Sequence, residues 1–372
     1  KETEVYLALD EFLTANPSRV AGTAGEYAAA QYLAKKFISF GYNTSLQDVP
    51  YYNDSDETFF SHNVISAKLS DKPNSGSVVI GAHYDTLAGS VGANDNACGI
   101  SALLTIGKQL KDVKFDFNII FVAFGAEELG SIGSKTYVRG LSEAQKDNIM
   151  LMINFDVIGS GDNLYVYGED VSTNFTNAFV STANNIKTPA PLLSKPLAQD
   201  IILLSYSFIN NDKVIYQTVQ NTDQQSFRDV GIPSMLFFSG SFGGKYVGYV
   251  ESQDESKWTM NTSKDNKEVL YSNLDAVIGR VETVVATVCA TLKQDNFLSI
   301  ATGARGELVA DIWTNAILPM VVYVLLLIGC IVGAVVVHQR LVKQSLLGGP
   351  VDIVNKKVFT KPDSDDIFTF RK

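Results

Sequence analysis

The sequence predicts an α/β fold in which a largely parallel sheet lies between layers of helices, followed by one membrane-spanning helix. Short apolar runs rich in Val, Ile and Phe, each bounded by turn residues, are typical of buried strands; they cover residues 78–82, 118–124, 150–155 and 232–238. Helical stretches separate several of these runs, and such alternation indicates a parallel α/β sheet. Near the C-terminus, residues 316–337 contain no charged side chain.

The helices of the body follow from the spacing of apolar residues. Residues 24–40 place apolar side chains at helical intervals, and Gly41 follows as a stop signal. In chain order, we expect helices at 24–40, 96–111, 129–138 and 268–293. The last of these is long and amphipathic and should close the domain. We therefore expect one domain over residues 1–293 and a stalk over 294–315, where the periodic pattern weakens.

The apolar segment 316–337 is long enough to cross a membrane, since about 1.5 Å per helical residue spans a hydrocarbon core of about 30 Å. The alternative is a buried helix of a soluble core, but the segment lacks a polar face. Basic residues gather downstream of it, whereas Arg305 alone lies close upstream; the downstream residues are Arg340, Lys343, Lys356 and Lys357. The positive-inside rule then predicts a cytoplasmic tail at 338–372 and a body outside the cytoplasm or in an organelle lumen.

The charge of the chain argues against nucleic-acid binding. The formal net charge is −10, and the acidic excess lies entirely upstream of residue 338. Binding to nucleic acid depends on neutralising phosphates with basic groups, so no nucleic-acid partner is expected. The three cysteines imply no disulfide framework.

Acidic and histidine residues follow the predicted strands. His83 and Asp85 come after the first strand, Asp95 precedes the next helix, and two further motifs, Glu127-Glu128 and Asp156, follow the second and third strands. The carboxyl ends of parallel strands share one crevice, so these groups should converge. Because several carboxylates in one cleft repel each other, a pair of divalent metal ions bridged by Asp95 would compensate their charge.

The motifs GAHYDT, GANDNACG, FGAEELGSIGS and INFDVIG, together with TDQQSFRDVGIPSM at 222–235, resemble the successive motifs of the M28 zinc metallopeptidases. The resemblance covers about residues 5–293. It implies a phosphorylase/hydrolase-like three-layer α/β/α sandwich with a mostly parallel mixed sheet. It also implies an aminopeptidase activity with a co-catalytic pair of zinc ions.

By motif position, the resemblance implies a role for each residue of the cluster. His83 and Glu128 would bind the first zinc, Asp95 would bridge the two ions, and Asp156 would bind the second. Glu127 would be the general base, and Asp85 would orient the His83 ring, as carboxylates commonly do for metal-bound histidines. Asp223, near the expected cleft, is a candidate for substrate contact.

One position departs from the family pattern. The family takes its last zinc ligand from a histidine just before the closing helix, and Asn261 stands at that position here. An amide oxygen is a weaker zinc ligand than imidazole. We therefore expect one well-held zinc at His83, Asp95 and Glu128. The second position, at Asp95, Asp156 and Asn261, should be weak, empty or filled by another divalent metal.

The leading hypothesis is a membrane-anchored metallo-aminopeptidase that hydrolyses peptides outside the cytoplasm, with Glu127 as base. The alternative is a catalytically weak or inactive ectodomain that acts as a receptor or interaction module, because Asn261 replaces the histidine. A glutaminyl cyclase on the same scaffold is a third possibility. Its zinc site also uses the missing histidine, which argues against it.

Overall fold

The structure, a computed structural model, describes residues 2–52, 57–72, 75–168, 173–194, 222–242, 249–301 and 318–346. The chain divides into two units, Lys1–Ala310 and Asp311–Lys372. The first contains all the expected site residues. Of the predicted stalk, residues 302–315 lie outside the described residues, as does the predicted tail beyond residue 346.

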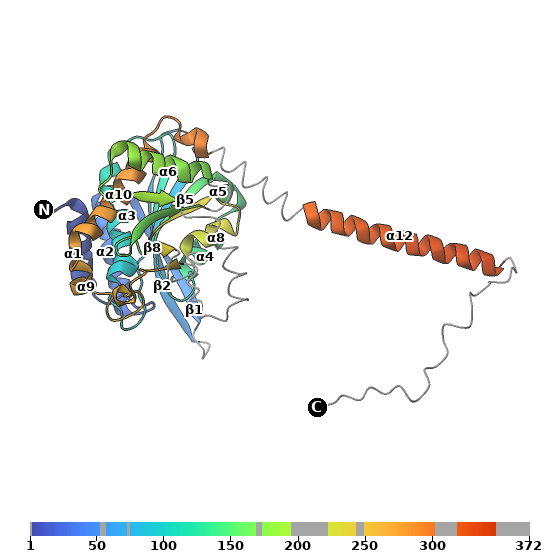
Figure 1. Ribbon diagram of the computed structural model, residues 1–372, viewed down its shortest axis with the longest axis horizontal. Coiled ribbons are helices and arrows are strands. Elements are labelled where there is room, and N and C mark those ends of the chain that lie inside the picture. Colours follow the sequence, from blue (N-terminus) through green and yellow to red (C-terminus); the bar gives the residue numbers. More distant parts are fainter. Residues whose placement is uncertain are drawn as a thin grey trace, which may run out of the picture. The chain divides into compact units, whose positions relative to one another are not determined.

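A single mixed sheet forms the centre of the first unit (Figure 1), with strand order β1-β2-β4-β3-β5-β8-β6-β7 and β9 paired to β8. The strands are β1 Asn43–Tyr52, β2 Thr58–Lys68, β3 Ser77–His83, β4 Asn118–Phe124, β5 Ile149–Phe155, β6 Asn163–Tyr167, β7 Leu192–Ser194, β8 Ser234–Phe242 and β9 Tyr249–Val250. The four central strands β4, β3, β5 and β8 run parallel. They correspond to the four strands that the sequence predicts.

The helices of the first unit are α1 Glu4–Ala15, α2 Ala24–Ser39, α3 Cys98–Leu110, α4 Ile132–Arg139, α5 Glu143–Asn148, α6 Thr173–Ile186, α8 Asp223–Arg228, α9 Lys267–Tyr271 and α10 Leu274–Leu292. Local signals explain where several of them begin. The side chain of Thr23 accepts the backbone N–H of Glu26 at the start of α2, and Asn266 caps α9 in the same way.

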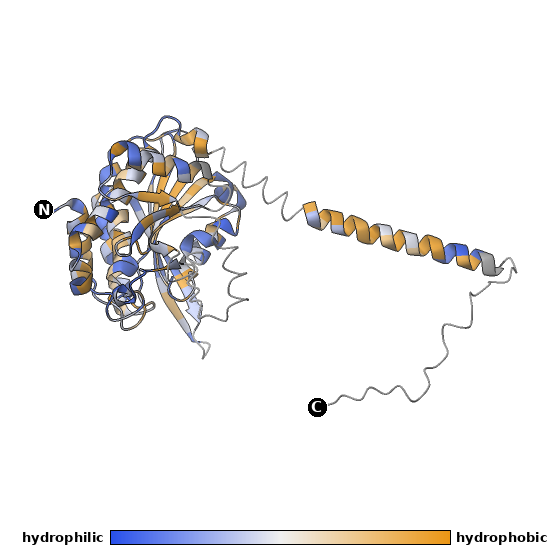
Figure 2. Cartoon of the chain, viewed as in Figure 1, coloured by the Kyte–Doolittle hydropathy of each residue, from blue (hydrophilic) through white to orange (hydrophobic). Residues whose placement is uncertain are grey.

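Helices cover both faces of the sheet, which gives three layers (Figure 1). Alternate residues of the central strands point to opposite faces. Val78 and Ile80 pack in the core beneath α1, α2, α3, α6 and α10, whereas Val79 packs with residues of α4 and α8. Figure 2 shows the apolar strands between the helix layers. The expected three-layer α/β/α architecture is confirmed.

The structure differs from the sequence-based prediction at the sheet margins and at two helices. The outer strands were not predicted: β1 has a single buried residue, Val49, β2 is exposed over its first three residues, and β6, β7 and β9 are short. The predicted helix at 129–138 begins only at Ile132, after Gly130 and Ser131 take positive φ angles. The closing helix is two helices, α9 and α10, with a break at residues 272–273.

The described part of the second unit is one helix, α12, Leu318–Leu346. Its stretch Leu318–Lys343 is long and apolar enough to cross a membrane by length and composition. Hydrophobic residues make up most of the length of α12 (Figure 2). This agrees with the predicted span at 316–337.

Candidate metal centre

Three adjacent parallel strands bring the predicted cluster together at one edge of the sheet. His83 is the last residue of β3, and β3 lies between β4 and β5. Asp156 directly follows the last residue of β5, and Glu127 and Glu128 follow the end of β4. Carboxyl ends of neighbouring parallel strands open on the same crevice. The order of the strands therefore brings motifs that are far apart in the sequence close together in space.

The centre of the site is a group of three side chains, His83, Asp95 and Asp156, whose ligand atoms all lie within 4.8 Å of one another. His83 Nε2 lies 3.1 Å from Asp95 Oδ1 and 3.3 Å from Asp156 Oδ1. His83 and Asp95 are buried, and Asp156 is partly exposed. One imidazole nitrogen and two carboxylate oxygens facing one point form a donor set that zinc accepts.

This grouping differs from the pairing that the resemblance implied. We expected Glu128 to share the first ion with His83 and Asp95. Among the described His, Cys, Asp and Glu residues, the structure instead groups His83 and Asp95 with Asp156. The physical reason is position along the strands: His83 and Asp156 stand at the very ends of paired strands, whereas Glu128 lies four residues beyond the end of β4.

Burial and the mutual repulsion of several acids perturb the pKa values of the site. Burial lowers the pKa of His83, but the negative charge of Asp156 and the hydrogen bonds to Asp156, Asp85 and Asp95 together outweigh burial, so the pKa of His83 is raised well above its usual range. Burial, reinforced by the charge of Asp95, raises the pKa of Glu128 to about 8. Burial likewise raises the pKa of Asp95. The site has an excess of negative charge, which a bound divalent cation would balance, so the residues present fit a metal ion.

Asp85 has a broader role than the one expected. Its Oδ1 lies 3.5 Å from Nδ1 of His83, on the side of the ring away from the three-ligand group. The same carboxylate accepts the backbone N–H of Glu127 at 3.0 Å and that of Glu128 at 3.1 Å. Asp85 is completely buried. It therefore connects the end of β3 to the turn after β4.

Glu127 lies at the rim of the metal group and is half-buried. Its Oε1 accepts a hydrogen bond from the Ser131 hydroxyl at 3.1 Å. Burial raises the pKa of Glu127 well above its usual range, although the positive charge of His83 opposes this effect. A carboxylate with a raised pKa beside a metal site has the properties of a general base that also returns its proton.

The turn that carries Asp95 contains contacts that the sequence did not reveal. Gly92 has a φ of 62°, and the Asp95–Asn96 peptide bond is cis. The carboxylate of Asp265 accepts the backbone N–H groups of Asn94 at 2.7 Å and Asp95 at 3.0 Å. Buried Arg19 donates to the carbonyl of Gly92 at 2.9 Å. Neither Arg19 nor Asp265 lies in a motif that predicts such a contact.

Two other buried acids surround the site. Asp223, the first residue of α8, is completely buried, and burial raises its pKa to about 7. This burial does not support the predicted substrate contact. Glu251 accepts the backbone N–H groups of Thr259 and Met260, each at 2.5 Å, and burial raises its pKa to about 7. Glu251 carried no signal in the sequence, because a lone glutamate is most often a surface residue.

The side chain of Asn261 is exposed, unlike the buried side chains of His83 and Asp95. The φ of 60° at Asn261 places this residue in a left-handed turn. The loop just before it is tied down by the contact between Glu251 and Met260. This placement argues against the prediction that Asn261 completes a second metal position.

Comparison with known proteins gives the family. The model of "Peptidase family M28" matches residues 63–286. The alkaline phosphatase isozyme conversion protein of Escherichia coli (strain K12) is 30% identical over 171 residues, which cover 40% of this chain and 49% of that protein. Aminopeptidase YwaD of Bacillus subtilis (strain 168) is 42% identical over 102 residues, 26% of this chain and 22% of that protein. The chain thus spans at most about half the length of these relatives.

Solved structures share the fold. A zinc aminopeptidase from Bacillus subtilis matches with a TM-score of 0.58 at 18% identity, covering 79% of this chain and 95% of that one. The glutaminyl cyclase of Porphyromonas gingivalis matches with a TM-score of 0.56 at 19% identity, covering 77% and 96%. These likenesses show the architecture. Together with the family match, which covers more than half of the sequence, they confirm the resemblance, and the chain belongs to peptidase family M28.

Proposed function

We propose that this chain is a zinc-dependent aminopeptidase. The observation that carries the proposal is the convergence of His83 Nε2 with carboxylate oxygens of Asp95 and Asp156, at 3.1 and 3.3 Å. Membership of the M28 peptidases supports it, as do relatives that are named as aminopeptidases. Peptides with a free N-terminus are the proposed substrates.

His83, Asp95 and Asp156 would hold the zinc ion. When bound there, zinc supplies Lewis acidity toward the scissile carbonyl and toward water. Glu127 takes a proton from the attacking water at a carboxylate oxygen and returns it to the leaving amine nitrogen. The Ser131 hydroxyl and the Asp85 carboxylate hold Glu127 in place for this transfer, one through its side chain and the other through its backbone.

We further propose that the chain holds one zinc tightly. A second position would use the remaining oxygen of Asp95 together with Glu128, whose pKa responds to the charge of Asp95. Asn261 replaces the family histidine and its side chain is exposed, so the loop at residue 261 supplies no imidazole ligand to this second position. An oxygen-only set favours a harder ion over zinc. Metal analysis of the purified protein that finds two tightly held zinc ions per chain would contradict this proposal.

Turnover of paired substrates tests the activity. The full chain in detergent should release the amine from an amino acid anilide with a free α-amino group, but not from its N-acetylated counterpart. Glu127→Gln should lower kcat by about 10²- to 10⁴-fold, the usual contribution of a general base, with little change in zinc affinity. Glu143→Gln, at an exposed acid on α5, is the matched control and should not change kcat.

The same experiment separates the enzyme from the alternative of an inactive ectodomain. Absence of turnover in the parent, with gain of turnover in Asn261→His, would favour the inactive ectodomain. Cleavage of the acetylated substrate would show an amidase that is not an exopeptidase.

We propose that α12 anchors the body to a membrane, with the tail in the cytoplasm and the peptidase domain outside it. The length and apolar surface of α12 support the anchor, and the basic residues downstream, including Arg340 and Lys343, support the orientation. Membranes washed with alkaline carbonate should retain the chain. In sealed cells, external protease should digest the peptidase domain but leave a tag at the C-terminus intact.

A further inference from the structure

The turn from Val91 to Asp95 presents the carboxylate at the centre of the metal group, yet it has little regular structure of its own. Asp95 and Asn96 have non-helical backbone angles in the segment Ala93–Ala97 that precedes α3. The position of Asp95 is therefore not determined by helix geometry. It depends on the side chains that contact the turn.

Arg19 contacts the first part of this turn. Its Nη1 donates to the carbonyl of Val91 at 2.9 Å, and its Nη2 donates to the carbonyl of Gly92 at 2.9 Å. The remaining contacts tie the same guanidinium to the carbonyls of Tyr84 at 2.6 Å and Asn16 at 3.1 Å. The arginine is completely buried, and within the described part of the chain it forms no ion pair with a carboxylate.

Burial of an arginine is costly when its hydrogen bonds all go to backbone carbonyls and none to a carboxylate. Arg19 also lies over the ring of Phe12, with 5.0 Å from the guanidinium carbon to the ring centroid. Its positive charge interacts electrostatically with four carboxylates of the acidic site, those of Asp265, Asp85, Asp95 and Glu128. Arg19 therefore links the loop after β3 to the Asp95 turn, and the nearby carboxylates offset part of the cost of burying its charge.

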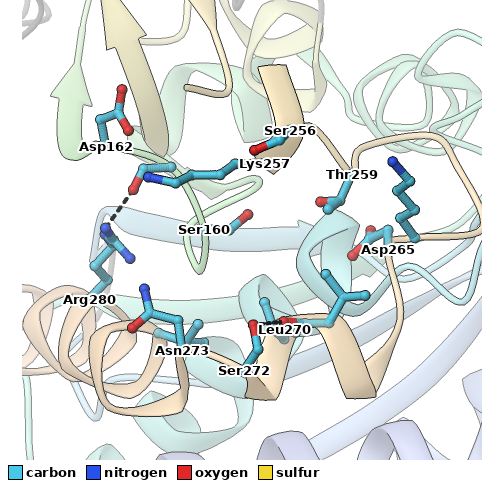
Figure 3. A pocket seen from close by; sticks show the side chains of 14 residues that line it. Ser160, Asp162, Ser256, Lys257, Thr259, Asp265, Leu270, Ser272, Asn273 and Arg280 are labelled. Carbon is cyan, nitrogen blue, oxygen red and sulfur yellow. Dashed lines mark hydrogen bonds between the residues drawn. The ribbon is translucent and has the colours of Figure 1, made fainter. Parts of the chain in front are cut away.

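Asp265 contacts the second part of the turn. Its two carboxylate oxygens accept the backbone N–H groups of Asn94 and Asp95, and its own carbonyl accepts the N–H of Ala93 at 3.3 Å. Asp265 lines a cavity of about 620 Å³ together with Asp162 and Arg280, and Figure 3 shows these side chains around it. Asp265 is buried all the same.

We propose that Arg19 and Asp265 are positioning residues that set the zinc affinity of the site by fixing Asp95. Arg19 holds the carbonyls at the start of the turn, and Asp265 holds the amides at its end. The two residues come from positions 246 apart in the chain, so tertiary folding alone brings them to one turn. The inference rests on the proposed zinc site at His83, Asp95 and Asp156.

The test measures zinc affinity and local backbone protection of the full chain in detergent. Arg19→Lys keeps the charge but cannot reach four carbonyls, and Asp265→Asn leaves one acceptor oxygen for two amides. Loss of outer contacts to metal ligands usually costs about 10- to 100-fold in metal affinity, so each variant should bind zinc at least about tenfold more weakly. Competition with a zinc chelator gives the dissociation constant. Amide hydrogen exchange of the metal-free protein should be faster over residues 91–96.

The chain offers a matched control for each variant. Lys68 is also a cation that donates to two backbone carbonyls, those of Leu110 and Lys111, away from the site. Asp162 shares the cavity of Figure 3 with Asp265 and accepts from Ser252 and from the backbone N–H of Gln253. Lys68→Met and Asp162→Asn should leave the zinc affinity unchanged.

Two results would overturn the inference. One is zinc affinity in Arg19→Lys and Asp265→Asn equal to that of the controls. The other is a loss of zinc affinity together with a lower unfolding temperature of the metal-free protein and faster amide exchange throughout the domain. That pattern would show a general loss of stability and not a local effect on residues 91–96. Failure of the parent chain to bind zinc would instead contradict the proposed function. In the double variant, the two losses should not add, because both act on one turn.

Discussion

The backbone N–H of Glu127 donates to the carboxylate of Asp85 at 3.0 Å, so a buried acid at the end of one strand holds the turn that carries the proposed base. The same carboxylate faces Nδ1 of His83 at 3.5 Å. Asp85 thus links the residue proposed to hold zinc with the residue proposed to move the proton.

This double contact predicts the effect of Asp85→Asn. The amide side chain has one acceptor oxygen in place of two, so one of the N–H groups of Glu127 and Glu128 loses its partner. We expect zinc affinity and kcat to fall together, each by about 10- to 100-fold. Asp116→Asn, at an exposed acid paired with Lys72, is the control. A fall in kcat with no change in zinc affinity would limit Asp85 to the orientation of Glu127.

The grouping of ligands predicts different results for Asp156 and Glu128. If zinc is held by His83, Asp95 and Asp156, Asp156→Asn should lose most of the tightly bound zinc, whereas Glu128→Gln should retain it. Measurement of zinc per chain after dialysis compares the two variants directly. The opposite result, with zinc lost in Glu128→Gln and kept in Asp156→Asn, would support the pairing that the resemblance implied.

Gly89 and Gly92 lie in one loop and allow a test of whether the shape of the Asp95 turn affects zinc binding. Gly92 has a φ of 62°, and a Cβ there would lie 2.4 Å from the Asp95 carbonyl oxygen and 2.8 Å from Nη2 of Arg19. Gly89 also has a positive φ, of 90°, but no atom lies within 4 Å of such a Cβ. Both alanine variants should lose about 1 kcal/mol or more of unfolding free energy from backbone strain. Only Gly92→Ala should also lose zinc affinity; equal zinc affinity in the two variants would contradict this.

Glu26 predicts a pH dependence of stability. Glu26 is buried and accepts the backbone N–H of Gly22 at 2.5 Å and the hydroxyl of Ser61. Burial raises its pKa from 4.5 to about 7. Between these values the folded state binds more protons than the unfolded state, so the contribution of Glu26 to stability falls as pH rises and is constant above about 7.

Glu26→Gln should remove that contribution. Urea unfolding of the metal-free protein gives the free energy of unfolding at about pH 5 and about pH 8. This free energy should fall less between the two pH values in the variant than in the parent, because the amide is neutral throughout. Glu11→Gln, at an exposed residue paired with Lys36, should keep the pH dependence of the parent. An identical pH dependence in parent and Glu26→Gln would show that Glu26 keeps an ordinary pKa.

The central strands and the members of the site were predictable because their signals are local. A strand buried on both faces needs a continuous apolar run, and the carboxyl ends of such strands carry the site in this fold class. The outer strands β1 and β2 were not predictable in this way. Their many exposed residues resemble those of other surface segments, and they are strands because β1 pairs with β2 and β2 pairs with β4.

The sequence by itself determined the α/β class, the apolar segment that becomes α12, and the acidic and histidine residues that gather at the candidate metal centre. Only the tertiary structure shows which of those side chains lie close together. It places the ligand atoms of His83, Asp95 and Asp156 within 4.8 Å of one another, and it brings Arg19 and Asp265 to the Asp95 turn. The physical reason is that ligand grouping and backbone support depend on distances of a few ångströms between strand ends and loops, which no local pattern of residues encodes.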